Sequence, residues 1–177
     1  GIVIVTYICV SYYTVLENMQ TSSRNLLQLY GKELENKLEN ADMLLERLIY
    51  KNNDYDMLQS EKESERYYAS IEIKKIIQEQ ITYDQYVDAV VIGDSTYGSC
   101  LDYENSDMAY QEREDLRQYA LERAKEGSAK AEWMIVRIGL QNYVSKMYVW
   151  QGRSAGIFIS VDHFMDNVTK KNLQKIF

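Results

Sequence analysis

Residues 131–161, AEWMIVRIGLQNYVSKMYVWQGRSAGIFISV, decide the fold. Three runs rich in Val, Ile, Met and aromatic residues are separated by two short breaks, and each break contains a glycine. Apolar runs of this length, bounded by turn formers, are typical of β-strands joined by hairpins. We therefore predict three consecutive antiparallel strands, at Ala131–Ile138, Tyr143–Trp150 and Ser154–Val161.

The hairpins determine which side chains share a face of this sheet. A loop over residues 139–142 predicts that Trp133 lies opposite Tyr148, and a tight turn at Gly152–Arg153 places Tyr148 opposite Ile157. The members of one face are then Trp133, Ile135, Arg137, Val144, Lys146, Tyr148, Ile157 and Ile159. The opposite face is almost entirely apolar and suits packing against a long helix. Its members are Met134, Val136, Ile138, Tyr143, Ser145, Met147 and Phe158.

The first face combines aromatic rings with two cations, which is the composition expected of a pocket for a small anion or zwitterion. We predict that four ligand-binding residues come from this face, and that tyrosines of an earlier hairpin join them. The predicted set is Trp133, Arg137, Lys146, Tyr148, Tyr97 and Tyr103. The alternative is that both cations extend to solvent while the other side chains form core.

Upstream of these strands the hydrophobic period changes from helical to strand-like. Apolar residues recur every three or four positions between Glu17 and Tyr50, which predicts one long amphipathic helix. The apolar positions are Leu27, Tyr30, Leu34, Leu38, Ala41, Leu45 and Leu48. The remaining predicted elements are helices at 60–81 and 107–126, strands at 86–93 and 97–103, and a final helix that begins at Asp162. This order predicts a single α+β domain over residues 17–177, with a five-stranded antiparallel sheet, the long N-terminal helix and flanking helices.

Residues 1–16 contain no charged side chain. A membrane-spanning helix needs about 20 apolar residues, and aromatic residues gather where such a helix leaves the bilayer. Tyr12 and Tyr13 lie near the end of this run. We expect residues 1–16 to be the C-terminal part of a transmembrane helix, with a buried strand or core helix as the alternative.

Composition excludes several functional classes. The chain has 177 residues, a net charge of −7 and a pI near 4.9, whereas a nucleic-acid-binding protein needs a basic face. Two distant cysteines and a single histidine, His163, do not suggest a metal site or a Ser-His or Cys-His catalytic arrangement. We therefore predict no cofactor, no metal and no enzymatic activity in this chain.

The stretch WQGRSAGIFISVDHFMDNV at 150–168 combines a glycine-containing turn, an apolar last strand and an aspartate that begins a helix. Together with the run at 86–92 followed by Gly93–Asp94, it resembles the extracytoplasmic PAS-like sensor module of the Cache superfamily. The likeness is closest to the sensor regions of membrane-bound histidine kinases and related transcription regulators. Many amino-acid-binding members carry an Arg and a Trp in the helix before the sheet. Arg66–Tyr67–Tyr68 is the nearest match here and lacks the Trp, so the ligand class stays open.

The resemblance implies an extracellular ligand-sensing input domain of a two-component signal-transduction receptor in the cell membrane. A small-molecule ligand is expected between the sheet and the helical insert at about 104–130. The full-length receptor is expected to be a homodimer. The alternative is a dimerisation or protein-interaction module without a ligand pocket, or the sensor of a membrane-bound transcription regulator.

Overall fold

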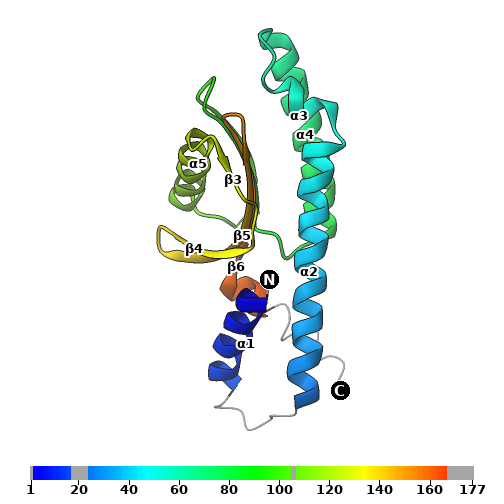
Figure 1. Ribbon diagram of the computed structural model, residues 1–177, viewed down its shortest axis with the longest axis vertical. Coiled ribbons are helices and arrows are strands. Elements are labelled where there is room, and N and C mark those ends of the chain that lie inside the picture. Colours follow the sequence, from blue (N-terminus) through cyan, green and yellow to red (C-terminus); the bar gives the residue numbers. More distant parts are fainter. Residues whose placement is uncertain (1, 17–23, 105–106, 167–177) are drawn as a thin grey trace.

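The computed structural model describes residues 2–16, 24–104 and 107–166 (Figure 1). The helices in these ranges are α1 (Ile2–Leu16), α2 (Arg24–Tyr50), α3 (Asn53–Met57), α4 (Glu63–Tyr83) and α5 (Tyr110–Lys125). The strands are β1 (Ala89–Asp94), β2 (Ser99–Glu104), β3 (Ser128–Ala129), β4 (Met134–Ile138), β5 (Gln141–Trp150) and β6 (Arg153–Ser160). The α+β class and the antiparallel sheet predicted from the sequence are confirmed.

Some predicted segments extend beyond the described part of the chain. The long helix is present from Arg24 to Tyr50, and the stretch 17–23 lies outside the described residues. The final helix is present over residues 161–166, and its predicted continuation to the C-terminus also lies outside them.

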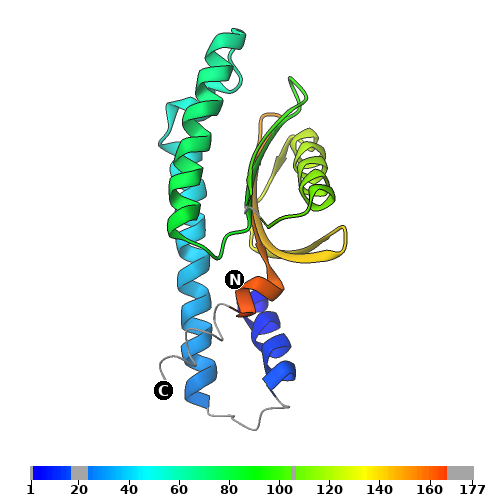
Figure 2. The ribbon, with the colours of Figure 1, turned by 180° about the vertical axis from the view of Figure 1, so that it is seen from behind.

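The sheet lies between two helical layers. The helices α2 and α4 run side by side along one face, and α5 covers the other, as both views show (Figures 1 and 2). The strand order is β2-β1-β6-β5, and β3 and β4 both pair with the outer edge of β5. All six residues of β1 are buried, because a central strand with helices on both faces has no side exposed to water.

The predicted strand register was wrong by two residues in both hairpins. Tyr148 lies opposite Ala155 and not Ile157, and Ile135 lies opposite Val144 and not Lys146. Each turn is centred one residue earlier than expected, on Gly139–Leu140 and on Gln151–Gly152, and each loop is two residues long. A shift of two residues keeps every side chain on its face, so the predicted membership of the two faces is confirmed.

The predicted partners of the two faces, however, were exchanged. The face with Lys146 and Tyr148 packs against α2 and α4, and the mainly apolar face packs against α5. The ligand expected between this mixed face and the helical insert therefore has no place there. The physical reason is a carboxylate on α2, Asp42, which pairs with Lys146 and Tyr148 of the mixed face.

The edge strand predicted at 131–138 is present only as β4, from Met134 to Ile138, and the short β3, which was not predicted, pairs separately with β5, so the described sheet has six strands and not five. Met134 pairs with Ser145 and Ala129 pairs with Val149, so the four residues 130–133 span a distance covered by three on β5. One extra residue makes a β-bulge, and the alternation of side chains between the two faces is therefore reversed across it. Ala129 accordingly packs on the α5 side of the sheet.

The apolar stripe of α2 forms the centre of the larger core. The predicted positions with described side chains are all buried: Leu34, Leu38, Ala41, Leu45 and Leu48. Ile4 and Ile8 of α1 join the same cluster. In the described ranges, none of the helices combines the length and the apolar character that crossing a membrane requires.

On the other side of the sheet, α5 approaches β1 very closely. Two of its three buried residues are alanines, Ala120 and Ala124, and Ala120 faces Gly93. The Ser154 hydroxyl donates a hydrogen bond of 2.6 Å to the carbonyl oxygen of Ala120. A Cβ atom at position 93 would lie 2.7 Å from that same oxygen, so only glycine fits there.

We predict that Gly93→Ala destabilises the fold by about 1 to 3 kcal/mol, because the new methyl group must push α5 away from the sheet. Chemical denaturation measures this loss. Gly31→Ala on α2 is the matched control, since a Cβ there meets no atom within 4 Å. Alanine within a helix is favoured over glycine by roughly 1 kcal/mol, so the control is expected to be neutral or stabilising. Equal stability of the two variants would contradict the close approach.

Candidate functional site

Asp42 connects the long helix to the sheet. Its Oδ2 atom lies 2.5 Å from the Lys146 Nζ, and its Oδ1 accepts a hydrogen bond of 2.9 Å from the Tyr148 hydroxyl. The side chains of Asp42 and Lys146 are mostly buried, with 22% and 13% of their surface exposed. Burial and the hydrogen bond to Asp42 raise the pKa of Tyr148 well above its usual value, so the phenol keeps its proton. Two of the predicted ligand-binding residues are therefore already paired with α2.

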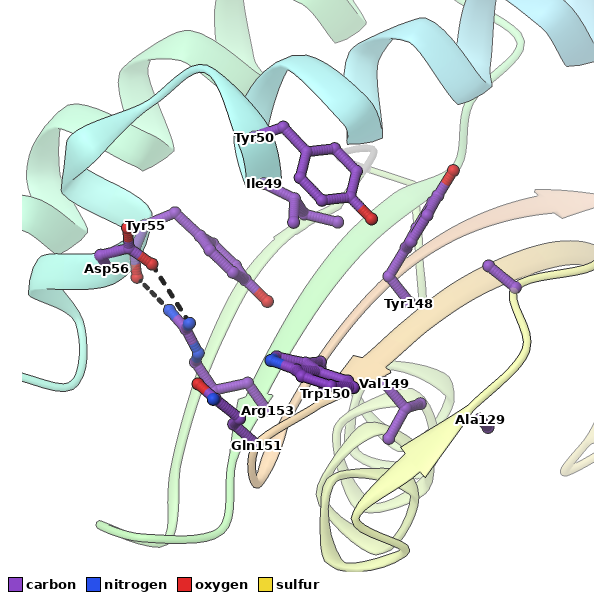
Figure 3. Close-up of a pocket in the computed structure, with 11 residues that line it drawn as sticks. Ile49, Tyr50, Tyr55, Asp56, Ala129, Tyr148, Val149, Trp150, Gln151 and Arg153 are labelled. Atoms are coloured by element: carbon purple, nitrogen blue, oxygen red, sulfur yellow. Dashed lines mark hydrogen bonds and ion pairs between the residues drawn. The ribbon is translucent and has the colours of Figure 1, made fainter.

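A cavity of about 660 Å³ opens beside Tyr148, between the C-terminal end of α2 and the β5–β6 hairpin (Figure 3). Its volume is typical of small-molecule sites. Four aromatic side chains surround it, and we call Tyr50, Tyr55, Tyr148 and Trp150 the aromatic cage. The rings of Tyr50 and Tyr148 meet edge to face, with centroids 6.1 Å apart and planes at 87°. The other lining residues are Ile49, Asp56, Ala129, Ala131, Val149, Gln151 and Arg153.

Arg153 closes the end of the cavity nearest α3. Its guanidinium donates a hydrogen bond of 2.6 Å to the carbonyl oxygen of Tyr55 and lies 3.2 Å from Oδ1 of Asp56. It also stacks on the Tyr55 ring, 4.3 Å from the centroid. The side chain is 8% exposed, and its Nε has no hydrogen-bond partner in the described structure. Burial raises the pKa of Tyr55 to about 12, although the neighbouring guanidinium lowers it.

The turn between β5 and β6 explains why the sequence did not indicate Arg153. Gln151 and Gly152 both have positive φ angles, 50° and 74°, as a type I′ turn requires. Arg153 is therefore the first residue of β6, opposite Trp150, and not a turn residue as predicted. A glycine at the second central position was the available signal, because it favours the turn at Gln151–Gly152.

The six predicted ligand-binding residues do not converge on one site. Arg137 is exposed and lies opposite Asn142 near the tip of the β4–β5 hairpin, away from the cavity. Tyr97 lies in the turn between β1 and β2, under the guanidinium of Arg66, 4.0 Å from its ring centroid. Tyr103 on β2 packs against the larger core. Of the six, Tyr148 alone lines the aromatic cavity.

Trp133 and Lys146 line a second, wider groove of about 900 Å³. The groove runs between α1 and the bulge at 130–133, and it includes the exposed side chains of Ile2, Val3 and Tyr7. The bulge separates this groove from the aromatic cavity, since Ala131 lines both. The aromatic cavity is the stronger candidate for a ligand site, because four aromatic side chains and a buried arginine line it.

Among residues 2–16, 24–104 and 107–166, no three His, Cys, Asp or Glu side chains gather closely enough to hold a metal ion. A comparison with models of known protein families gives no match, and a comparison with curated proteins also gives none.

We predict that Asp42→Asn costs about 1 to 3 kcal/mol of stability, because it leaves the ammonium of Lys146 partly buried without a counter-charge. Equilibrium unfolding in urea measures the loss. Glu39→Gln is the matched control, an exposed carboxylate on the same helix, and should change stability by less than about 0.5 kcal/mol. If the two variants were equally stable, Asp42 would not be the attachment between helix and sheet.

Proposed function

We propose that this chain is the ligand-sensing input domain of a transmembrane signal-transduction receptor, namely a sensor histidine kinase. One observation carries the proposal: the aromatic cavity lies between the end of the long helix and the β5–β6 hairpin. A ligand in this cavity touches both layers at once. Its binding can therefore change how α2 sits on the sheet.

Several contacts around the cavity support a role in coupling the two layers. Arg153 holds the backbone of α3 at Tyr55, and the Gln59 amide donates a hydrogen bond of 3.2 Å to the carbonyl oxygen of Gln151. Asp42 attaches α2 to Tyr148, whose ring is part of the cage. The cavity thus lies where α2, α3 and the hairpin meet.

Transmission would follow from differential affinity. If a ligand binds one arrangement of α2 on the sheet more tightly than another, it shifts the population toward that arrangement by the difference in binding free energy. Small sliding motions of packed helices are a common form of such a change. In this proposal the chain binds and transmits, and the phosphoryl chemistry belongs to a separate transmitter part of the receptor.

In this proposal the chain is a sensor module of the Cache type, and residues 17–177 lie on the extracytoplasmic side of the membrane. The proposal is supported by the antiparallel sheet with a long helix along one face and a helical insert over the other. Residues 1–16 would attach the domain to the membrane, and the receptor would act as a homodimer. The alternative form of the proposal is that this chain is the sensor of a membrane-bound transcription regulator, in which the same cavity would bind the ligand.

A non-ligand-binding interaction module is the second candidate. It is favoured by large side chains that α4 leaves exposed: Tyr67 at 63%, Tyr68 at 68% and Ile71 at 43%. A partner helix or a second copy of the chain that covered these side chains would use α4 as a dimer surface.

A thermal-shift screen of the chain against amino acids, amines, organic acids, sugars and nucleobases tests the proposal. We expect a saturable rise in melting temperature for one chemical class, because a ligand that binds the native state stabilises it by mass action. Tyr50→Ala, which removes an exposed wall of the cage, should abolish the rise. Tyr83→Ala is the matched control, an exposed tyrosine at the end of α4, and should leave the rise unchanged.

A rise that survives Tyr50→Ala would place the ligand outside the cavity and contradict the proposed site. No response to any class, together with an oligomeric state that depends on concentration in sedimentation experiments, would favour the interaction module instead.

A further inference from the structure

We propose that the aromatic cage binds an organic cation, a small ligand that carries an alkylated ammonium group. This inference rests on the proposed function, since it names the ligand class of the same cavity. It replaces the anion or zwitterion expected from the sequence, because that expectation depended on Arg137 and Lys146 converging in one pocket.

The first argument is the geometry of the cage. The faces of aromatic rings carry partial negative charge and attract cations that lie within about 6 Å of the centroid. Figure 3 shows Tyr50, Tyr55, Tyr148 and Trp150 on different sides of one cavity, which all four side chains line. Several rings around one point are the arrangement that proteins use to recognise quaternary ammonium groups.

The second argument is that the chain's own cations already lie against two of these rings. The Arg153 guanidinium lies 4.3 Å from the centroid of Tyr55, and the Lys146 ammonium lies 5.4 Å from that of Tyr148. Among the described ring contacts, no cation lies over Tyr50 or Trp150. Trp150 is also 64% exposed although it borders the cavity. The end of the cage formed by Tyr50 and Trp150 is therefore the part that remains for a ligand.

The third argument is the balance of charge around the cavity. Asp56 pairs with Arg153, and Asp42 pairs with Lys146, so each cation already has a carboxylate partner. Burial is the main cause of the raised pKa of Tyr148, and the nearby carboxylates of Asp42 and Glu46 raise it further. The two ion pairs cancel in charge, and Glu46 adds one negative charge near Tyr148, so an additional positive charge is attracted and not repelled there.

An anionic ligand fits the cavity less well. Arg153 is the cation that lines it, and two of its nitrogens already bond to the Tyr55 carbonyl and to Asp56. The N–H groups that remain belong to a side chain that is only 8% exposed and already paired with Asp56, so an anion could reach them only by displacing that carboxylate.

The test compares choline with its neutral isostere 3,3-dimethylbutan-1-ol, which has the same shape but a carbon in place of the charged nitrogen. The whole chain is titrated with each compound, and with tetramethylammonium, glucose and acetate, by isothermal titration calorimetry at constant chloride concentration. We expect saturable binding of choline and tetramethylammonium. The neutral isostere should bind roughly threefold to thirtyfold more weakly, the range that corresponds to a cation–π attraction.

Two tryptophan variants provide a matched pair. Trp150→Leu removes a cage ring and should weaken choline binding by a similar factor, whereas Trp133→Leu, in the groove beside α1, should not change it. Circular dichroism of both variants checks that they remain folded. Unchanged choline binding in a folded Trp150→Leu variant would overturn the inference.

Equal affinity for choline and its isostere would also overturn it, as would binding of glucose or acetate without binding of either cation. Those outcomes would leave the cavity as a ligand site, so the proposed function would stand. The absence of binding by all five compounds would overturn the cation inference. The proposed function would then depend on the wider thermal-shift screen with Tyr50→Ala.

Discussion

The arrangement of the helical layer on the sheet depends on Asp42. Its carboxylate pairs with Lys146 and Tyr148, which lie more than 100 positions further along the chain. Without this partner, the sheet face that carries an ammonium and a phenol would bury unpaired polar groups against an apolar helix stripe, which costs free energy. With it, the same face packs against the leucines of α2. The contact also fixes Tyr148 where it forms one wall of the aromatic cavity.

The two faces of the sheet have different roles because their packing differs. On the α5 side, Gly93 and the alanines of the helix allow close contact with β1, and the space is filled. On the α2 side, the helix ends at Tyr50 and the short α3 turns away, so large aromatic side chains border a space that remains open. The bulge at 130–133 interrupts the pairing with β5 beside that space. A ligand site is therefore expected where the helical layer changes direction.

The sequence predicted the elements and the faces of the sheet well, since hydrophobic period determines both. The α2 stripe from Leu34 to Leu48 is buried as expected, and each strand residue keeps its predicted face. The site was not predictable to the same degree. A turn that begins one residue earlier moved Arg153 from a loop into β6, and the one carboxylate that orients the mixed face, Asp42, looks like any other charge on a helix surface. Long-range pairing of this kind leaves no local pattern in a sequence.

A double-mutant cycle between Asp42 and Tyr148 tests the central claim most directly. The stabilities of Asp42→Ala, Tyr148→Phe and the double variant are measured by urea denaturation and compared with the unmodified chain. Since both single variants break the same hydrogen bond, we predict that the double variant loses less stability than the sum of the two. The expected coupling is about 0.5 to 3 kcal/mol. Strictly additive losses would contradict the account, because they would show that Asp42 does not hold Tyr148 and the sheet to the long helix.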